Sequence, residues 1–334
     1  MKKLIQKNIL PPLMKLNAEH LFRLIAQKKG LNIFYHGVVK QDSTSIFPRH
    51  ITTSQFEQHI KYLKRKFNII SMHEMFEMYK ENITPDKWTI TVSFDDGYAN
   101  NLENALEIIE KHKVKTTFFI SSICIENPDH IMWSDVLSFI RIYSPQVIID
   151  NIEFEKIGKF GLYNKELDVT ASDYIKKLSP EKREKTLERM ISNHQLLKKM
   201  KSIPKEYWKL LDSNQLKELA SSEFVDIGSH GHLHYNLGNI ALVAAIEDMK
   251  KSKQLLSNAI NQNIDLLSYP DGSYTKAVMD AAENLGYTKQ VAVNYKHTTD
   301  DDDKRIINRW GVSSTTTFET IAFTLNKAFI KNSF

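Results

Sequence analysis

The sequence predicts an α/β fold whose parallel strands can close into a barrel. Short apolar, strand-like runs alternate with amphipathic helical segments through most of the chain, which is typical of sheets built from strand–helix–strand units. The chain has 334 residues, of which 42% are hydrophobic, so it can bury a large core. α/β barrels often use about 200–400 residues in one domain.

The predicted strands are short runs rich in apolar and β-branched residues. In chain order they cover residues 32–36, 68–70, 88–94, 116–120, 224–227, 265–269 and 290–293. The helices between them show apolar positions at 3.6-residue spacing, or a stop signal such as Gly286. They cover residues 54–66, 72–80, 102–112, 242–258 and 276–285.

Residues 127–219 depart from this alternation. The stretch is rich in Lys, Glu, Leu and Met and shows helical patterns such as 181–199, so we predict a mostly helical insertion between two barrel strands. Insertions at the ligand-binding face of a barrel often shape the substrate cleft. Its aromatic residues could stack on a sugar or could only anchor helices: Trp133, Tyr207 and Trp208.

Residues 1–30 are predicted to form a basic amphipathic segment ahead of a single folded domain over 31–334. Residues 1–29 hold seven Lys or Arg and one Glu among apolar residues. Such a segment could contact an anionic membrane face peripherally, or pack as a helix on the domain. Pro11-Pro12 and polar residues interrupt the apolar run, so no signal peptide or membrane span is predicted, and we expect a cytoplasmic protein, peripheral at the inner membrane face if that segment binds lipid.

Charge and cysteine content exclude some classes of function. The chain has 45 Lys and Arg against 40 Asp and Glu, a net charge of +5 without a long basic run, which does not indicate nucleic-acid binding. Anionic small molecules, glycans and lipid head groups remain compatible. The single Cys124 excludes an internal disulfide and, among apolar neighbours, is predicted to be a buried structural thiol. The acidic run 300–303 is interpreted as a solvated loop.

The most informative segment is Phe94-Asp95-Asp96-Gly97, where an apolar strand runs directly into two carboxylates. α/β folds bind ligands at the carboxyl edge of the sheet, so chemistry is expected here. Adjacent carboxylates repel each other unless a cation or a shared proton relieves them. The pair suggests one acid on a metal and the other free as a base, although Asp-Asp-Gly is often only a turn or a helix N-cap.

Candidate metal ligands follow another predicted strand, in the run His230-Gly231-His232-Leu233-His234. Three imidazoles within five residues suit a borderline-soft divalent ion such as Zn²⁺, and Co²⁺, Ni²⁺ or Fe²⁺ would fit the same donors. One Asp with two His would leave coordination positions open for water and substrate. Because both halves follow strands, a metal centre is favoured over an exposed histidine run.

Together these motifs resemble the polysaccharide deacetylases of the NodB-homology type, carbohydrate esterase family 4. Residues 93–98 look like the first motif of that family, and His230 through His234 look like its His-x3-His second motif. Residues 268–274 resemble the Tyr-Pro-x-Gly variant of the third motif, found in a branch with an N-terminal Tyr-His, here Tyr35-His36. The resemblance spans about residues 31–315 and implies a distorted (β/α) barrel carrying the helical insertion.

The resemblance also implies the metal site. Asp96, His230 and His234 would hold the metal, and Asp95 would be the general base for the attacking water. Strand alternation would instead pair His230 with His232, but the family pattern and a turn after the intervening glycine favour His234.

Other implied residues act on the substrate. The third motif, Tyr269-Pro270-Asp271, would contact the substrate, and the Asp271 N–H would help to bind the oxyanion. His36 would be the general acid for the departing amine. Arg309 is the nearest replacement for the arginine that steadies the base in the family, and its neighbour Trp310 is assigned to the substrate site. An aromatic residue usually stands in place of Asp271, which could reduce tolerance for anionic substrates or face solvent.

The resulting hypothesis is a metal-dependent hydrolase that removes N-acetyl or related N-acyl groups from amino sugars of a surface polysaccharide or its precursor. Expected substrates are an N-acetylated glycan, a lipid-linked glycan or a nucleotide sugar. Two alternatives stay open: an amidase on a non-sugar C–N bond using the same metal site, and a non-catalytic glycan-binding relative. The complete set of ligands and base argues against the last.

Overall fold

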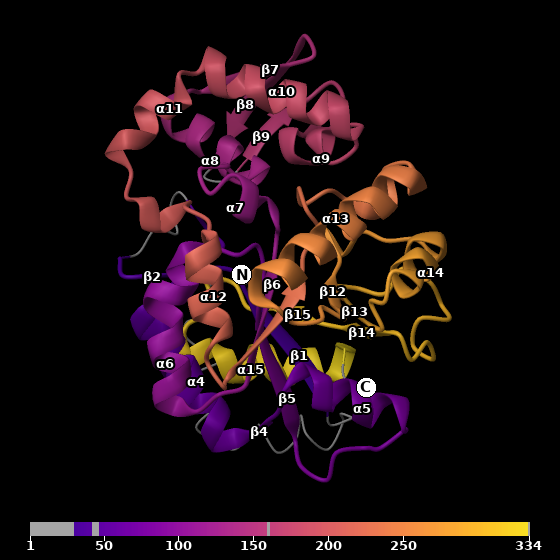
Figure 1. The fold of residues 1–334 in the computed structure, drawn as a ribbon. Helices are drawn as coiled ribbons and strands as arrows, with labels where there is room; N and C mark the ends of the chain where they lie inside the picture. Colours follow the sequence, from indigo (N-terminus) through magenta and orange to yellow (C-terminus); the bar gives the residue numbers. More distant parts are fainter. Residues whose placement is uncertain (1–29, 42–46, 159–160, 333–334) are drawn as a thin grey trace.

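The computed structural model describes residues 30–41, 47–158 and 161–332. Within them, eight parallel strands form one path that curls into a nearly closed barrel with helices outside it (Figure 1). The predicted α/β barrel is confirmed. In spatial order the strands are β14 (Ile306–Asn308), β13 (Lys289–Ala292), β12 (Leu266–Ser268), β11 (Val225–Ser229), β6 (Thr116–Ile120), β5 (Thr89–Phe94), β1 (Gly30–Tyr35) and β15 (Trp310–Gly311).

Every predicted strand is present, with its ends shifted by at most two residues. β1 and β5 are buried along their whole length, as expected of central parallel strands covered on both faces. The short strand β4 (Asn68–Ile69) also pairs with β5. β2 (Val38–Val39) and β3 (Ile51–Thr52) form a separate parallel pair.

A single residue joins the two ends of the barrel sheet. β14 and β15 lie at the two ends of the strand path, yet only Arg309 separates them in the sequence. β14 pairs with β13, and β15 pairs with β1 through Trp310 opposite Ile33. The sequence predicts no strand beyond residue 293, because strands of three and two residues are too short to show a period.

Helices cover the outside of the barrel. Five match the predictions: α4 (Thr53–Lys66), α5 (Met72–Lys80), α6 (Leu106–His112) after the π-helical turn η2 (Asn101–Ala105), α13 (Leu242–Ile260) and α14 (Lys276–Asn284). Capping boxes start two of them, Thr52 with Gln55 at α4 and Ser71 with Glu74 at α5. α15 (Phe318–Asn332) is not predicted. The remaining short turns are η3 (Met200–Ser202), η4 (Lys205–Tyr207), η5 (Leu237–Asn239) and η6 (Pro270–Gly272).

The prediction of a mostly helical insertion between β6 and β11 is wrong over residues 146–170. This part forms an antiparallel sheet of β7 (Gln146–Ile149), β8 (Ile152–Ile157), β9 (Gly161–Asn164) and β10 (Val169–Thr170). In β8, Phe154 is buried while Glu153 and Glu155 are exposed, which is the alternation of a half-buried strand. The charged residues of β8 made this alternation hard to recognise in the sequence.

The rest of the insertion is helical. Its helices are α7 (Ile123–Glu126), α8 (Trp133–Tyr143), α9 (Ala171–Ile175), α10 (Pro180–Asn193), α11 (Leu196–Lys199) and α12 (Ser213–Ala220). The single helix predicted over 181–199 is two helices, because Gln195 between them has a φ of 50°.

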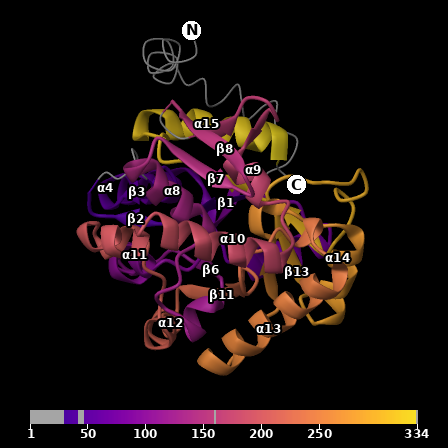
Figure 2. The same cartoon turned by 90° about the horizontal axis from the view of Figure 1, so that it is seen from above.

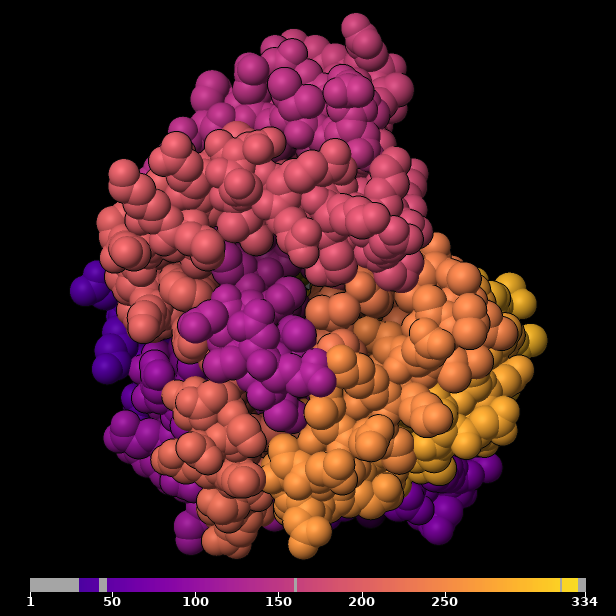
Figure 3. Space-filling model, turned by 45° about the horizontal axis from the view of Figure 1, so that its top comes forward, coloured from indigo at the N-terminus to yellow at the C-terminus, as the bar shows by residue number. Residues whose placement is uncertain are grey.

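The insertion has its own hydrophobic core and stands over the barrel, as the side view and the space-filling view show (Figures 1 and 3). The view from above shows its strands and helices lying across the barrel (Figure 2). Tyr207 and Trp208 are buried in this core, so they anchor the insertion. Trp133 belongs to the same core but also lines a cavity described below.

Two predictions about single residues have different outcomes. Cys124 is buried, which confirms a structural thiol, and burial raises the pKa of that thiol to about 12. Asp300, by contrast, is fully buried and accepts hydrogen bonds from the Tyr274 hydroxyl (2.6 Å) and the His297 N–H (2.8 Å). The interpretation of 300–303 as a solvated loop is therefore wrong at its first residue.

The predicted amphipathic segment 1–29 lies outside the described residues, so its peripheral membrane contact stays a prediction. In the part of the chain that the structure describes, no helix combines the length and apolar character needed to span a bilayer.

Candidate active site

The end of β5 places the two adjacent carboxylates. The Asp95 N–H still donates to the Tyr35 carbonyl (3.0 Å), which continues the strand ladder by one residue. Asp96 and Gly97 then adopt positive φ values of 78° and 88°, and the chain turns sharply. A Cβ at Gly97 would lie 3.1 Å from Ile120, so glycine suits this turn both sterically and conformationally.

The end of β11 places the histidines. The His230 N–H donates to the Ile120 carbonyl (2.9 Å), and the chain then turns around the buried carboxylate of Asp248 in α13. Asp248 accepts the backbone N–H groups of His232 (2.8 Å) and Leu233 (3.0 Å). His234 adopts a φ of 53°, so the turn returns its ring to the site.

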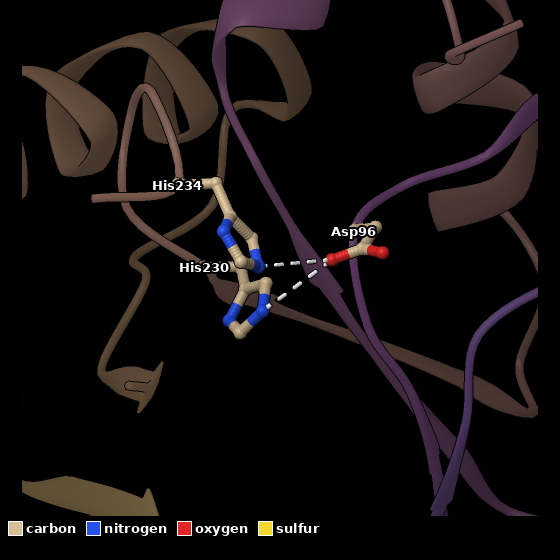
Figure 4. Close-up of side chains that lie close together, drawn as sticks. All are labelled: Asp96, His230 and His234. Carbon is tan, nitrogen blue, oxygen red and sulfur yellow. Dashed lines mark ion pairs between the residues drawn. The ribbon is translucent and has the colours of Figure 1, made fainter. Parts of the chain in front are cut away.

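Asp96, His230 and His234 converge on one point (Figure 4). The Nε2 atoms of His234 and His230 lie 3.3 and 3.6 Å from Asp96 Oδ1, and the donor atoms all lie within 4.8 Å of one another. Asp96 Oδ1 is buried and has no hydrogen-bond partner among the described residues. An orphaned carboxylate oxygen facing two imidazole nitrogens fits a divalent metal ion.

A second contact orients His230 for this role. Its Nδ1 lies 2.9 Å from the Ser268 carbonyl, which assigns the proton to Nδ1 and leaves the Nε2 lone pair facing the site. Burial lowers the pKa of His230 to about 4, so its ring is neutral at pH 7, as a metal ligand must be.

His232 points away from this cluster. Its Nδ1 lies 2.9 Å from the Ser122 hydroxyl, and its Nε2 lies 3.4 Å from Glu126. The geometry therefore brings together the ligand set with His234, and the alternation that would pair His230 with His232 fails because the strand ends at Ser229.

Asp95 lies beside the cluster and is held by Arg309. The guanidinium donates to both carboxylate oxygens, at 2.8 and 2.7 Å, and also to the hydroxyls of Ser93 (3.1 Å) and Ser268 (2.6 Å). Burial alone would raise the pKa of Asp95, but the charge of Arg309, with that of His230, outweighs burial and lowers it. Asp95 is thus ionised at neutral pH and fixed in orientation.

The pKa values of Asp96 and His234 shift in opposite directions because the two side chains face each other. Burial would raise the pKa of Asp96, but the His234 ring, whose Nε2 lies 3.3 Å from Asp96 Oδ1, outweighs burial and holds that pKa well below its usual range. Burial would lower the pKa of His234, but Asp96 outweighs it and raises that pKa. In the protein without metal, the pair therefore favours a carboxylate facing a protonated Nε2.

His36 lines a cavity of about 260 Å³ together with Asp96 and His234. Its ring packs edge-on against Phe34 at 5.5 Å between centroids. Burial lowers the pKa of His36, although the charges of Asp96 and Asp95 oppose that shift. Its position suits proton transfer to a substrate in the cavity.

The residues assigned to the substrate divide into two groups. Asp271 lines the cavity, and its carboxylate pairs with Lys176 at 3.1 Å, so it does not simply face solvent. Tyr269 points away: its hydroxyl donates to Gln290 (2.6 Å) in the core. Trp310 packs against the main hydrophobic cluster and does not line the cavity, because neighbouring strand residues face opposite sides and Arg309 faces inward. Neither side chain lines the cavity, and Pro270 is also buried outside its lining, so the cavity gives no support to these three substrate assignments.

Sequence reasoning missed the contacts that the insertion makes with the site. The Trp133 Nε1–H donates to His234 Nδ1 (3.2 Å), and Arg183 donates to the carbonyls of His234 (3.0 Å) and Leu233. Arg183 is only 3% exposed, although it lies in a stretch of alternating Lys, Arg and Glu. That composition gave no signal to separate the buried Arg183 from its exposed neighbours.

Comparisons with known proteins identify the family of this chain. A family model described as "Polysaccharide deacetylase" matches residues 82–147 and 171–290, which is more than half of the chain and leaves out part of the insertion. The Bacillus subtilis protein named "Putative polysaccharide deacetylase YxkH" is 20% identical over 282 residues, covering 84% of this chain and 70% of that protein.

Solved structures share the fold. The Streptococcus pyogenes deacetylase PplD in complex with acetate superimposes with a TM-score of 0.57 at 16% identity, over 88% of this chain and 96% of that one. IcaB from Ammonifex degensii gives a TM-score of 0.56 at 14% identity, over 90% and 97% of the two chains. A de-N-acetylase from Aggregatibacter actinomycetemcomitans gives 0.56 at 18% identity, over 88% and 99%.

Proposed function

Because this chain belongs to the polysaccharide deacetylase family, we propose that it is a metal-dependent hydrolase that removes N-acetyl groups from amino sugars. One observation carries the proposal. The buried Oδ1 of Asp96 lacks a hydrogen-bond partner among the described residues and faces His230 and His234. The ionised Asp95 lies beside these three residues. This arrangement supplies three ligands and a separate base, which hydrolysis of an amide needs.

In this proposal each side chain has one task. A divalent ion held by Asp96, His230 and His234 would supply Lewis acidity, which polarises the acetamido carbonyl and activates water. Asp95 would take the proton of the water as its oxygen bonds to the carbonyl carbon, and Arg309 keeps both Asp95 oxygens fixed. His36 would have to carry a proton when the substrate binds, and it would then give that proton to the nitrogen as the C–N bond breaks, leaving acetate and a free amine.

The nature of the donors supports Zn²⁺ as the ion, with Co²⁺, Ni²⁺ or Fe²⁺ able to replace it. For the substrate we propose an N-acetylated glycan or its lipid-linked or nucleotide-linked precursor. The cavity of about 260 Å³ lies near the lower end of ligand pockets, which supports binding of one sugar unit at a time.

The test is acetate release from N-acetylated hexosamine oligomers, nucleotide sugars and a lipid-linked glycan. The protein is assayed metal-stripped and after zinc loading, beside Asp95→Asn and the matched surface variant Asp129→Asn, whose wild-type side chain is 78% exposed. We expect zinc-dependent release by the wild type and Asp129→Asn, and a loss of about 10²–10⁴-fold in Asp95→Asn. Release that survives both metal stripping and Asp95→Asn would refute the proposal. Turnover of non-sugar amides alone would replace it with an amidase.

A further inference from the structure

The insertion turns the active site into a chamber with two walls. The barrel contributes His36, Arg49, Asp96, His234 and Asp271 to the lining of the 260 Å³ cavity, and the insertion contributes Trp133, Arg141 and Lys176 among others. A substrate bound in this cavity would therefore lie between side chains of the barrel and side chains of the insertion.

The charges in this lining are unequal. Three cationic side chains, Arg49, Arg141 and Lys176, face two carboxylates. Of these carboxylates, Asp96 belongs to the proposed metal site, and Asp271 is paired with Lys176 at 3.1 Å. Asp271, the acid expected to reduce tolerance for anions, is thus already paired with a lysine of the insertion, and two arginines line the same cavity.

Arg49 is held in place but keeps donor capacity. Its guanidinium pairs with Asp135 and donates to the Tyr98 hydroxyl (3.1 Å), which itself donates to Asp135 (2.9 Å). Asp135 is fully buried, whereas the Arg49 side chain is 26% exposed, and its Nε is buried without a hydrogen-bond partner among the described residues. The pair fixes Arg49 at the cavity wall without covering it.

Arg141 stands on α8, two turns beyond Trp133, and lines the same cavity. Burial lowers the pKa of Arg141, and the charge of Arg49 lowers it further, so the two guanidinium groups repel each other across the wall. A bound anion would relieve this repulsion, and the planar fork of arginine matches both carboxylate and phosphate oxygens.

We propose that Arg49 and Arg141 form an anion subsite, so that the preferred substrate is an N-acetylated amino sugar with a carboxylate or phosphate on the same sugar unit. This inference rests on the proposed deacetylation for the acetamido group, while the anion contact itself depends only on the two arginines.

The experiment measures binding by calorimetry to the zinc-loaded protein. The probes are 2-acetamido-2-deoxyglucose, its 1-phosphate and its uronate, which separate a neutral sugar from the two sources of charge. We expect at least one charged probe to bind about tenfold or more tightly than the neutral sugar, as for hydrogen bonds to charged groups. Arg141→Gln should remove most of that preference and leave the neutral sugar within about twofold, whereas Arg141→Lys should keep part of it.

A matched control is Arg189→Gln, because the Arg189 side chain is 62% exposed, pairs with Asp150 and does not line the cavity. Any binding of an anion to zinc persists in Arg141→Gln. The difference in affinity for the charged probes between wild type and Arg141→Gln therefore measures the contribution of Arg141 alone. Equal binding of all three probes, no binding of the charged probes at millimolar concentration, or equal losses for neutral and charged probes would overturn the subsite. Selective anion binding without acetate release would instead count against the proposed deacetylation alone.

Discussion

Arg309 binds both carboxylate oxygens of Asp95, and it does so from the one residue that joins the two ends of the barrel sheet. The two side chains are 0% and 4% exposed, so the pair is shielded from water. A buried bidentate pair fixes the plane of the carboxylate as well as its charge. The candidate base is therefore oriented by the closure of the barrel itself.

Arg309→Lys should reduce kcat by about 10–100-fold, because a single ammonium cannot bind both oxygens and the carboxylate can rotate. Arg309 lowers the pKa of Asp95, and lysine would make fewer hydrogen bonds to this carboxylate. The pKa of Asp95 should therefore rise, and the acidic limb of the pH–rate profile should move to higher pH. Steady-state kinetics across pH measures both effects. Arg305→Lys, in a peripheral ion pair with Asp303, is the control and should keep both the rate and the profile.

His234→Gln and His232→Gln should separate the two histidines that the sequence left in competition. We expect His234→Gln to weaken zinc binding by more than about 100-fold, because losing a ligand costs more than losing a hydrogen bond that only orients one. His232→Gln loses only contacts with Ser122 and Glu126, so it should still bind one zinc per chain. Zinc content by atomic emission decides: zinc retained in His234→Gln would mean that this ligand set is wrong.

Trp133 should report metal binding by its fluorescence. Its N–H donates to His234 Nδ1, which requires the tautomer with the proton on Nε2. Zinc at Nε2 would move that proton to Nδ1, and the indole would lose its acceptor. We expect zinc titration to change the tryptophan emission. Trp133→Phe should lose most of that change and keep zinc affinity within about threefold, because the indole contacts a ligand but does not bind the metal. An unchanged signal in Trp133→Phe would contradict this assignment.

Arg183→Met should destabilise the protein by about 2–4 kcal/mol, since it removes charged hydrogen bonds to two buried carbonyls of the His234 turn. Zinc affinity should fall with it because the turn loosens. Arg189→Met, six residues along the same helix and exposed, should change stability by less than about 0.5 kcal/mol. Urea unfolding of both variants measures the difference, and equal losses would show that the buried contacts add nothing.

Asp303 should make stability depend on pH at a distance from the site. Hydrogen bonds from Arg305 lower the pKa of Asp303 from 3.8 to about 2, so the folded state favours its charged form. This stability is present above pH 4 and is lost as pH falls toward 2, and it amounts to about 1 kcal/mol once screening by solvent is taken into account. Asp303→Asn should be less stable by that amount at pH 7, and the gap should narrow toward pH 3 in urea titrations. The exposed neighbour Asp302→Asn serves as the control.

Local signals explain what the sequence could predict. The capping box of Ser71 and Glu74 fixes the start of α5, and β6 is predicted to the residue because five apolar or β-branched residues stand between polar ones. The carboxylates and histidines directly follow such strands, so they could be placed at one edge of the sheet before their geometry was known.

What could not be predicted depends on long-range contacts. Trp310 looked like a substrate residue beside Arg309, but strand parity turns it outward. Tyr269 matched a motif, yet its side chain belongs to the core, and of the three residues Tyr269, Pro270 and Asp271 it is Asp271 that lines the cavity. Arg183 reads as one more surface charge until the fold shows that it holds the histidine turn.

Because β1 pairs with β15, the barrel sheet cannot be completed until the end of the chain has been synthesised. Ile33 leaves the ribosome long before its partner Trp310, and contacts so distant in sequence form slowly. Until Arg309 emerges, the nascent barrel would carry two neighbouring carboxylates with no guanidinium to compensate them. A growing chain should therefore gain its base only with its last barrel strands, and a ribosome stalled before residue 309 should hold an inactive, open sheet.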